Sequence, residues 1–306
     1  MHIILFALLF GASRTVVAMC AAGVLLFLIG LWAAKTDIAR ARGVDKFVAA
    51  TNLCFAIPLA VFGALHLSTV AFVVPAVPAY MPWRLFWAYL VGVALVSASL
   101  SIATKIQVFW SALLFGIMMF LFVLMMDLPG AIANPRDRFG WTLAIRELSF
   151  AAGGWLLAAG AMRGPRRTKL IAVGRVIIGV AAIFYGIEHF LHPLHCPGVP
   201  LEKIMPTYIP IRPVIGYLTG AILVVAGAAI LLNRKTRQAA TYLGTWIVLL
   251  VVFVYGPILI VQLLDPSIAA QIEGINYFAD TLLFAAAILA LAVASPDLTS
   301  QVVVDS

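Results

Sequence analysis

Long runs of apolar residues with little or no charge recur along this chain of 306 residues. Three of them, at 16–34, 86–103 and 246–264, approach the length of about 20 residues with which a helix crosses a hydrocarbon core about 30 Å thick. Inside a bilayer the backbone must satisfy its own hydrogen bonds, so only helices or closed barrels span it. The runs are continuous and rich in Ala, Leu and Phe, which favours helices over alternating barrel strands. The sequence therefore predicts an all-α polytopic membrane protein.

The composition excludes an ordinary soluble domain. Of all residues, 64% are hydrophobic and 10% are charged, and the mean hydropathy is +1.10, whereas soluble domains are about half apolar and about a quarter charged. The net charge of +8 could suggest nucleic-acid binding, but the positions of the basic residues argue against it. Thirteen of the 20 Lys and Arg residues lie in four short segments, at 35–46, 105, 163–175 and 234–237.

These basic segments fall at every second connection between the expected helices. Cytoplasmic loops of membrane proteins carry an excess of Lys and Arg, so the pattern is an orientation signal. We expect a protein of a bacterial-type cytoplasmic (inner) membrane, with its N-terminus outside and its C-terminus in the cytoplasm. The first 14 residues have no basic region and no small-residue cleavage site, so we expect no cleavable signal peptide.

The apolar runs predict about nine transmembrane helices, none of them broken. Their expected bounds are 15–34, 47–66, 85–104, 107–127, 141–162, 172–191, 213–232, 240–264 and 274–295. With this topology, the connections at 67–84, 128–140, 192–212 and 265–273 face outward.

The second to fifth helices and the sixth to ninth helices are expected to be copies of each other. The stretch PAYMPWRLFWAYLVG at 78–92 aligns without gaps with PTYIPIRPVIGYLTG at 206–220. Seven positions are identical: Pro78, Tyr80, Pro82, Arg84, Tyr89, Leu90 and Gly92 recur as Pro206, Tyr208, Pro210, Arg212, Tyr217, Leu218 and Gly220. Such self-similarity is the signature of an internal repeat.

Each copy has an even number of helices, so both copies enter the membrane in the same direction. Parallel repeats of this kind are related by an axis along the membrane normal. We expect an N-terminal helix with a cytoplasmic loop (1–46), two four-helix bundles (47–163 and 172–295) and a cytoplasmic tail (296–306).

The chain resembles the DoxX-like superfamily of small four-helix membrane proteins. The resemblance rests on the G-x-x-H end of the first helix of each copy, Gly63/His66 and Gly186/His189, and on the Pro-x-Arg step into the second helix. It covers about 47–163 and 172–295, although a fused pair departs from the usual single unit. The family includes proteins of thiosulfate:quinone oxidation and of periplasmic thiol maturation. The resemblance implies membrane-associated redox or small-solute work, and no defined reaction.

His66 and His189 are the first candidate site residues, because both copies keep them at the same helix end. Either they close the helix, where a donor meets free carbonyls, or they face the bundle interior as an acid/base, a quinone hydrogen-bond donor or a ligand. Arg84 and Arg212 begin equivalent helices, where the helix dipole disfavours a cation. They either extend to the outer headgroups or bind an anionic or carbonyl ligand, with Tyr80 and Tyr208 as neighbouring donors.

Arg146 and Asp280 occupy equivalent positions when the copies are aligned on Phe150 and Phe284. They are expected either to form an ion pair that joins the two bundles or to line a cavity that carries protons or substrate. Glu147 follows Arg146, and since successive helical residues point about 100° apart, the two are expected on different faces.

A candidate metal site lies in the stretch GIEHFLHPLHCPG at 186–198. Imidazole and thiolate ligands suit zinc or copper, which makes His189, His192, His195 and Cys196 the candidate ligands. Their spacing matches no established zinc motif, so a polar interfacial loop is the alternative. Cysteine usage indicates no disulfide framework.

Three functions are compatible with these features. The first is a membrane redox-associated component that acts at the outer leaflet on quinone, thiol or metal, with a periplasmic or membrane redox partner. The second is a small-solute transporter with its site at the repeat interface, and the third is a non-catalytic membrane scaffold. A quinone or a transition metal is the cofactor that these features suggest, and the lipid bilayer is the expected surroundings. The candidate polar residues all project to the outer half, so we expect a site that opens outward.

Overall fold

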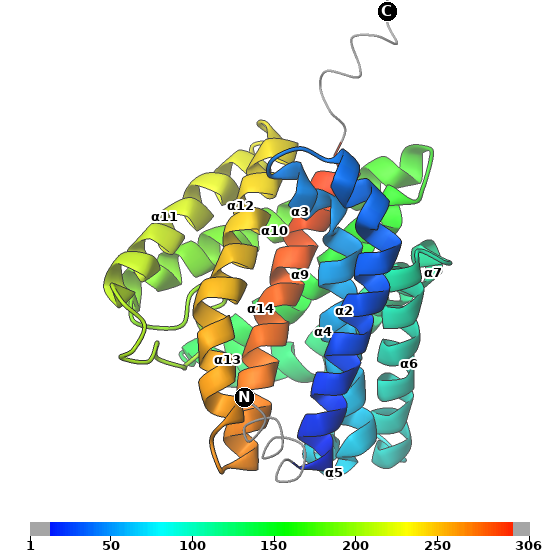
Figure 1. Ribbon diagram of the computed structural model, residues 1–306, viewed down its shortest axis with the longest axis vertical. Helices are drawn as coiled ribbons and strands as arrows, with labels where there is room; N and C mark the ends of the chain where they lie inside the picture. The colour runs from blue at the N-terminus through cyan, green and yellow to red at the C-terminus, as the bar shows by residue number, and fades with distance from the viewer. Residues whose placement is uncertain (1–12, 296–306) are drawn as a thin grey trace, which may run out of the picture.

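The computed structural model describes residues 13–295, and the expectations for the N-terminal 12 residues and for the tail at 296–306 lie outside this range. The described chain is mostly helical (Figure 1), and its only β pairing is an isolated bridge between His195 and Ile204. Eight of its helical runs are long and apolar enough to cross a membrane. The predicted class, an all-α polytopic membrane protein, is confirmed.

The helices follow the expected order. The N-terminal part contains α2 (Arg14–Arg40) and α3 (Asp45–Ala49). The next set contains α4 (Thr51–Ser68), α5 (Val70–Val73), the 3₁₀ turn η1 (Val74–Ala76), α6 (Arg84–Thr104), α7 (Val108–Phe122), the π-helical turn η2 (Val123–Asp127), α8 (Leu128–Ala133) and α9 (Arg138–Gly160). The last set contains α10 (Pro165–Leu191), α11 (Arg212–Leu231), α12 (Thr236–Leu250), the π-helical turn η3 (Val251–Tyr255), α13 (Gly256–Leu263) and α14 (Ile268–Ala294).

Some helices are longer than the apolar runs that predicted them. Helix α2 continues to Arg40, and α10 already begins at Pro165, because polar residues extend a helix beyond the hydrocarbon layer without breaking its hydrogen bonds. The predicted outward loop at 128–140 is partly wrong, since the chain stays helical to Ala133. Helix α9 is not among the eight apolar spans, but its 23 residues cover about 35 Å.

Prolines are accommodated by π-helical turns at the same place in both sets. A proline inside a helix lacks an N–H and its ring clashes with the carbonyl four residues earlier. For Pro129 and Pro257, those carbonyls belong to Met125 and Phe253, which lie within η2 and η3. Neither helix is broken, as expected, but each is locally widened in a way that the sequence pattern did not predict.

Further local features recur in the two sets. Trp83 and Ile211, directly before α6 and α11, both have left-handed backbone conformations, with φ of 54° and 47°. In each set, the first and second helices meet at glycines. A Cβ added to Gly63 would lie 3.1 Å from the Gly92 carbonyl oxygen, and one added to Gly186 would lie 2.9 Å from that of Gly220.

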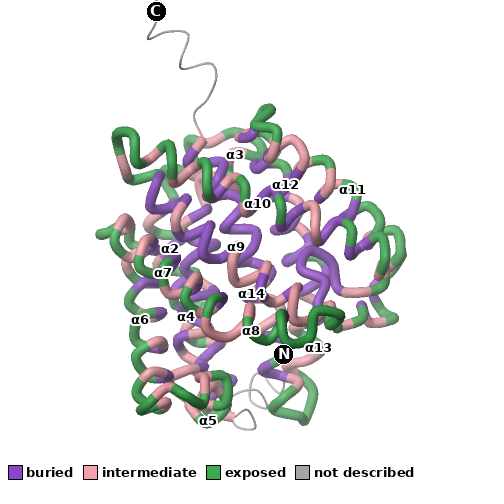
Figure 2. Tube along the Cα trace, turned by 180° about the vertical axis from the view of Figure 1, so that it is seen from behind, coloured by how far each residue is buried: buried purple, intermediate pink, exposed green. Residues whose placement is uncertain are grey.

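The two sets meet along α9 and α14, at the centre of the molecule. Arg146 contacts its repeat counterpart Asp280, and Gly153 packs on its counterpart Ala287. Two equivalent residues touch only where a pseudo-twofold axis passes between them, and these two contacts lie two helical turns apart. The axis therefore runs along the two helices, which is the geometry that a parallel duplication produces. Burial is greatest around these helices (Figure 2).

The close approach of α9 and α14 yields a first testable prediction. A Cβ at Gly153 would lie 2.7 Å from the Cα of Ala287, so Gly153→Ala forces the helices apart, and we expect a loss of about 1–3 kcal/mol in the free energy of unfolding. Gly160→Ala is the matched control, because its added Cβ meets only a Val293 methyl at 3.6 Å. Denaturant titration of both variants tests this, and equal stabilities would contradict the assigned contact.

The basic segments gather at one end of the bundle. Lys105 pairs with Asp37, Arg237 pairs with Asp45 at 3.4 Å, and Arg167 donates to the carbonyl of Ala294 at 2.7 Å. These contacts join the end of α2, α3, the α6–α7 connection, the start of α12 and the end of α14, near the C-terminal end in Figure 1. We call this end the basic end and the other the opposite end.

Candidate functional site

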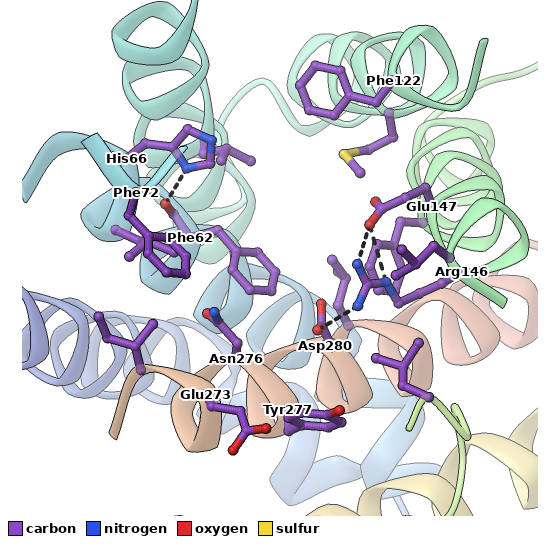
Figure 3. A pocket seen from close by; sticks show the side chains of 18 of the residues that line it. Phe62, His66, Phe72, Phe122, Arg146, Glu147, Glu273, Asn276, Tyr277 and Asp280 are labelled. Atoms are coloured by element: carbon purple, nitrogen blue, oxygen red, sulfur yellow. Dashed lines mark hydrogen bonds and ion pairs between the residues drawn. The ribbon is translucent and has the colours of Figure 1, made fainter. Parts of the chain in front are cut away.

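A cavity of about 790 Å³ extends from the opposite end toward the middle of the bundle. Its walls come from α4, α5, α6, α7, α9 and α14, with Leu201 from the α10–α11 loop, so both repeat copies contribute. Most of the lining is aromatic or aliphatic: Phe62, Phe72, Phe115, Phe122, Phe139, Phe150, Met118 and Met119 are among its members. We call it the Arg146 cavity, after the cation on its wall (Figure 3).

Arg146 lies between two carboxylates. Its Nη1 donates to Asp280 at 2.9 Å, while its Nε and Nη2 donate to one oxygen of Glu147 at 3.2 and 2.7 Å. The predicted pairing of Arg146 with Asp280 across the copies is present. The expectation that Arg146 and Glu147 lie on different faces is wrong, because their long side chains bend back toward each other.

Several hydrogen-bond acceptors of this cavity are free. The second oxygens of Glu147 and Asp280 receive no hydrogen bond from any described residue, and both side chains line the cavity. His66, which faces them in Figure 3, donates from Nδ1 to the carbonyl of Phe62 at 2.8 Å, which leaves its Nε2 as an acceptor when the ring is neutral. The buried side-chain oxygen of Asn276 also lacks a donor among the described residues.

The charge of the cluster follows from its members. One guanidinium and two ionised carboxylates sum to one negative charge in surroundings that are largely apolar. Burying an uncompensated charge is costly. The cavity is therefore complementary to a molecule that donates hydrogen bonds or carries positive charge, and it disfavours an anion.

His189 is not equivalent to His66 in its surroundings. It is fully buried, and its Nε2 accepts from the backbone N–H of Gly198 at 3.0 Å, while its Nδ1 has no partner among the described residues. Gly198 belongs to the longer α10–α11 loop of the second copy. This loop covers the histidine that the first copy leaves facing a cavity.

The α10–α11 loop, residues 192–211, folds inward as a plug. Cys196, Val199 and Met205 are almost fully buried. The hydroxyl of Tyr255 donates to the carbonyl of Pro197 at 2.8 Å, and the backbone closes on itself through the N–H of Cys196 and the carbonyl of Lys203. The extra residues of the second copy thus fill the interior beside His189.

Arg138, at the start of α9, holds this loop. Its guanidinium donates to the carbonyls of Pro200 and Leu201 at 2.7 and 2.8 Å and to Glu188 at 2.9 Å. On the other side, Lys203 pairs with Glu273 of α14 at 2.6 Å. These contacts fix Leu201 as part of the cavity wall.

The candidate metal set does not assemble. Within residues 13–295, no three His, Cys, Asp or Glu side chains are placed to hold a metal ion. The His189 ring is bonded to Gly198, and the rings of His192 and His195 stack at 5.0 Å between centroids. Burial and the Arg138 guanidinium lower the pKa of His195, whereas burial raises the pKa of the Cys196 thiol to about 12, away from the thiolate that binds metals. The alternative, a polar interfacial loop, differs from the structure in that much of this loop is buried.

Arg84 and Arg212 anchor the loops that precede their helices. Arg84 donates to the carbonyls of Val77 and Val74 at 2.9 and 2.7 Å, and Arg212 donates to that of Met205 at 3.0 Å. Neither arginine lines the Arg146 cavity. These hydrogen bonds to loop carbonyls account for an arginine at each helix N-terminus. They require neither of the two expected contacts, with lipid headgroups or with a ligand. Tyr80 and Tyr208 are largely exposed, at 71% and 48%.

Sequence reasoning missed Arg138 and assigned no role to Glu188. Neither has a charged counterpart in the other copy, since the alignment places Ile272 opposite Arg138 and Leu65 opposite Glu188. A comparison of the repeats therefore gave no signal. One signal was available: Glu188 places a carboxylate near the end of an apolar helix, directly before the loop in which the copies differ, and such a carboxylate needs a partner.

No protein-family model, no curated protein and no solved structure matches the chain.

Proposed function

We propose that this integral membrane protein is a redox-associated component that binds a quinone, in its reduced hydroquinone form, in the Arg146 cavity. The observation that carries the proposal is the set of free acceptors on Glu147, Asp280 and His66 around a largely apolar space. The resemblance to DoxX-like proteins, some of which act with quinones, supports the same class of ligand.

The fit depends on the oxidation state of the ring. A hydroquinone carries two hydroxyl donors, whereas the oxidised ring carries two carbonyl acceptors. Hydroxyl groups can donate to the free carboxylate oxygens and to the His66 Nε2, and the ring can pack among phenylalanines. A volume of about 790 Å³ is within the range of small-molecule sites.

The other redox ligands named by the sequence fit less well. A thiol reaction needs a thiolate, but Cys196 is 1% exposed and its pKa is raised to about 12. The four candidate metal ligands do not come together as a metal-binding group in the described part of the chain. Quinone chemistry remains the proposal that the described side chains support.

The proposed orientation follows from the charges. Since the basic end is expected to face the cytoplasm, the cavity would open toward the outer leaflet. This matches an outward site on the inner membrane of a bacterial-type cell, where a periplasmic or membrane redox partner could receive the electrons.

Transport is the second candidate, and one observation favours it. The cavity lies between the repeat copies and carries net negative charge, as a site for a cationic solute would. The probes tetramethylhydroquinone and tetraphenylphosphonium distinguish the two. Binding of the phosphonium ion alone, with uptake into vesicles, would replace the redox proposal.

The test is binding of tetramethylhydroquinone to the protein in nanodiscs under anaerobic conditions. Asp280→Asn removes a charge-assisted acceptor worth about 1.5–3 kcal/mol, so we expect the Kd to rise about tenfold to hundredfold. Glu202→Gln, the same change on an exposed loop residue, is the control and should leave the Kd unchanged. A wild-type protein that does not bind the hydroquinone, and yields no quinone on lipid extraction, would refute the proposal.

A further inference from the structure

A second, apolar cavity lies beside the first. It measures about 440 Å³ and runs between α6 and α7, toward the loop that contains η1. His66 is the only side chain among its lining residues that titrates, and aliphatic residues such as Val73, Ala94, Leu114 and Leu121 make up most of its wall. We call it the α6–α7 groove.

The groove adjoins the Arg146 cavity. His66, Met118 and Phe122 line both spaces, so the two adjoin at these three side chains. Met118 has a flexible, unbranched side chain that adapts to what packs against it. Figure 3 shows His66 and Phe122 on the side of the Arg146 cavity that is farthest from Asp280.

The groove reaches the outer surface of the bundle. Leu90, Leu114 and Leu121 line it and are 44%, 59% and 46% exposed. In a bilayer, such a surface at the middle of a span contacts acyl chains. A molecule dissolved in the membrane can therefore reach the polar cavity from the side.

We infer that the ligand of the Arg146 cavity is a tailed amphiphile whose donor-bearing head contacts Glu147 and Asp280 and whose apolar chain leaves past His66 through the α6–α7 groove. This inference rests on the proposed function and adds the shape of the ligand and its route. The continuity of a charged cavity with an uncharged, lipid-facing groove is what favours a single ligand with two unlike ends.

The energetics determine which experiment is informative. Lipid is as apolar as the groove, so moving a chain from one to the other gains little. The groove instead provides the space that a chain needs while its head is bound. Closing the groove should therefore penalise tailed ligands and leave tail-less ligands unaffected.

Ala94→Trp tests this, because Ala94 is exposed and lines the groove, so a larger side chain fills the groove without entering the core. Val93→Trp is the matched control, on the same helix and 53% exposed, but outside the groove. The probes are tetramethylhydroquinone and a hydroquinone with a ten-carbon chain, with Kd values measured in the same nanodiscs so that partitioning cancels between variants.

We expect Ala94→Trp to raise the Kd of the tailed probe at least tenfold and that of the tail-less probe less than twofold. Val93→Trp should change neither. If Ala94→Trp leaves the tailed probe unaffected, or weakens both probes equally, the route is wrong while hydroquinone binding stands. If the wild-type protein binds neither probe, the proposed function itself fails.

Discussion

Replacing Arg146 with methionine should lower the free energy of unfolding by about 3–5 kcal/mol. The substitution keeps an apolar stem but leaves Glu147 and Asp280 as two carboxylates without their cation. Two like charges in a largely apolar space lose their partner and also repel each other, which is the costliest way to disrupt a buried ion cluster. Reversible denaturation in mixed detergent micelles measures the change.

Asp280→Asn is the informative comparison. It leaves Arg146 paired with Glu147 through two hydrogen bonds and makes the cluster neutral, so we expect a change within about 1 kcal/mol. The triple variant Arg146→Met/Glu147→Gln/Asp280→Asn has no formal charge and should recover most of the stability lost in Arg146→Met. If Arg146→Met costs less than Asp280→Asn, the cluster is not held by the guanidinium and this account of its charge is wrong.

The different expected effects of Arg146→Met and Asp280→Asn also distinguish a role in stability from a role in ligand binding. Asp280→Asn is expected to weaken hydroquinone binding while the protein stays folded, because its lost oxygen faces the cavity and not the core. A residue kept only for packing would give the reverse pattern, with stability lost and binding per folded molecule unchanged. The cluster is thus tested as a site and as a structural contact by the same set of variants.

The helices and the central ion pair could be predicted from the sequence, because apolar runs mark the helices and the alignment of the copies marks the ion pair. Apolar runs report the thickness of a bilayer, and the alignment of the copies placed Arg146 opposite Asp280 before any contact was known. The contact between Gly153 and Ala287 follows from the same offset of 134 residues, which shows how much a repeat can predict about its own axis.

The rest of the site has no such signal. The π-helical turns depend on how a helix reorganises around a proline, which residue types do not specify. His66 and His189 occupy equivalent positions in the two copies, but one faces a cavity and the other a backbone amide, because the inserted residues of one loop fold inward. An insertion breaks the equivalence on which the comparison of the copies depends. The metal site was predicted because the residues of that loop were considered as a motif by themselves, without the fold around them.

The last prediction concerns the buried α10–α11 loop and the reaction of its Cys196 with maleimide. The thiolate is the reactive form, and burial raises the pKa of this thiol from 9.0 to about 12, so ionisation alone slows labelling about a thousandfold. We expect Arg138→Met to release the loop, since it removes the donors to Pro200 and Leu201 and strands the carboxylate of Glu188. The labelling rate at pH 7.5, in a background with Cys20→Ala and Cys54→Ala, should rise by about two to three orders of magnitude.

Two further variants show whether charge drives the opening. Arg84→Met, which frees the corresponding loop of the first copy, should leave the labelling of Cys196 at its native rate. Adding Glu188→Gln to Arg138→Met removes the stranded charge and should restore part of the protection, because an amide costs less to bury than a carboxylate. Rapid labelling in the protein without the Arg138 substitution would mean that the loop does not plug the second copy. In that case the burial of His189 by this loop would also be wrong.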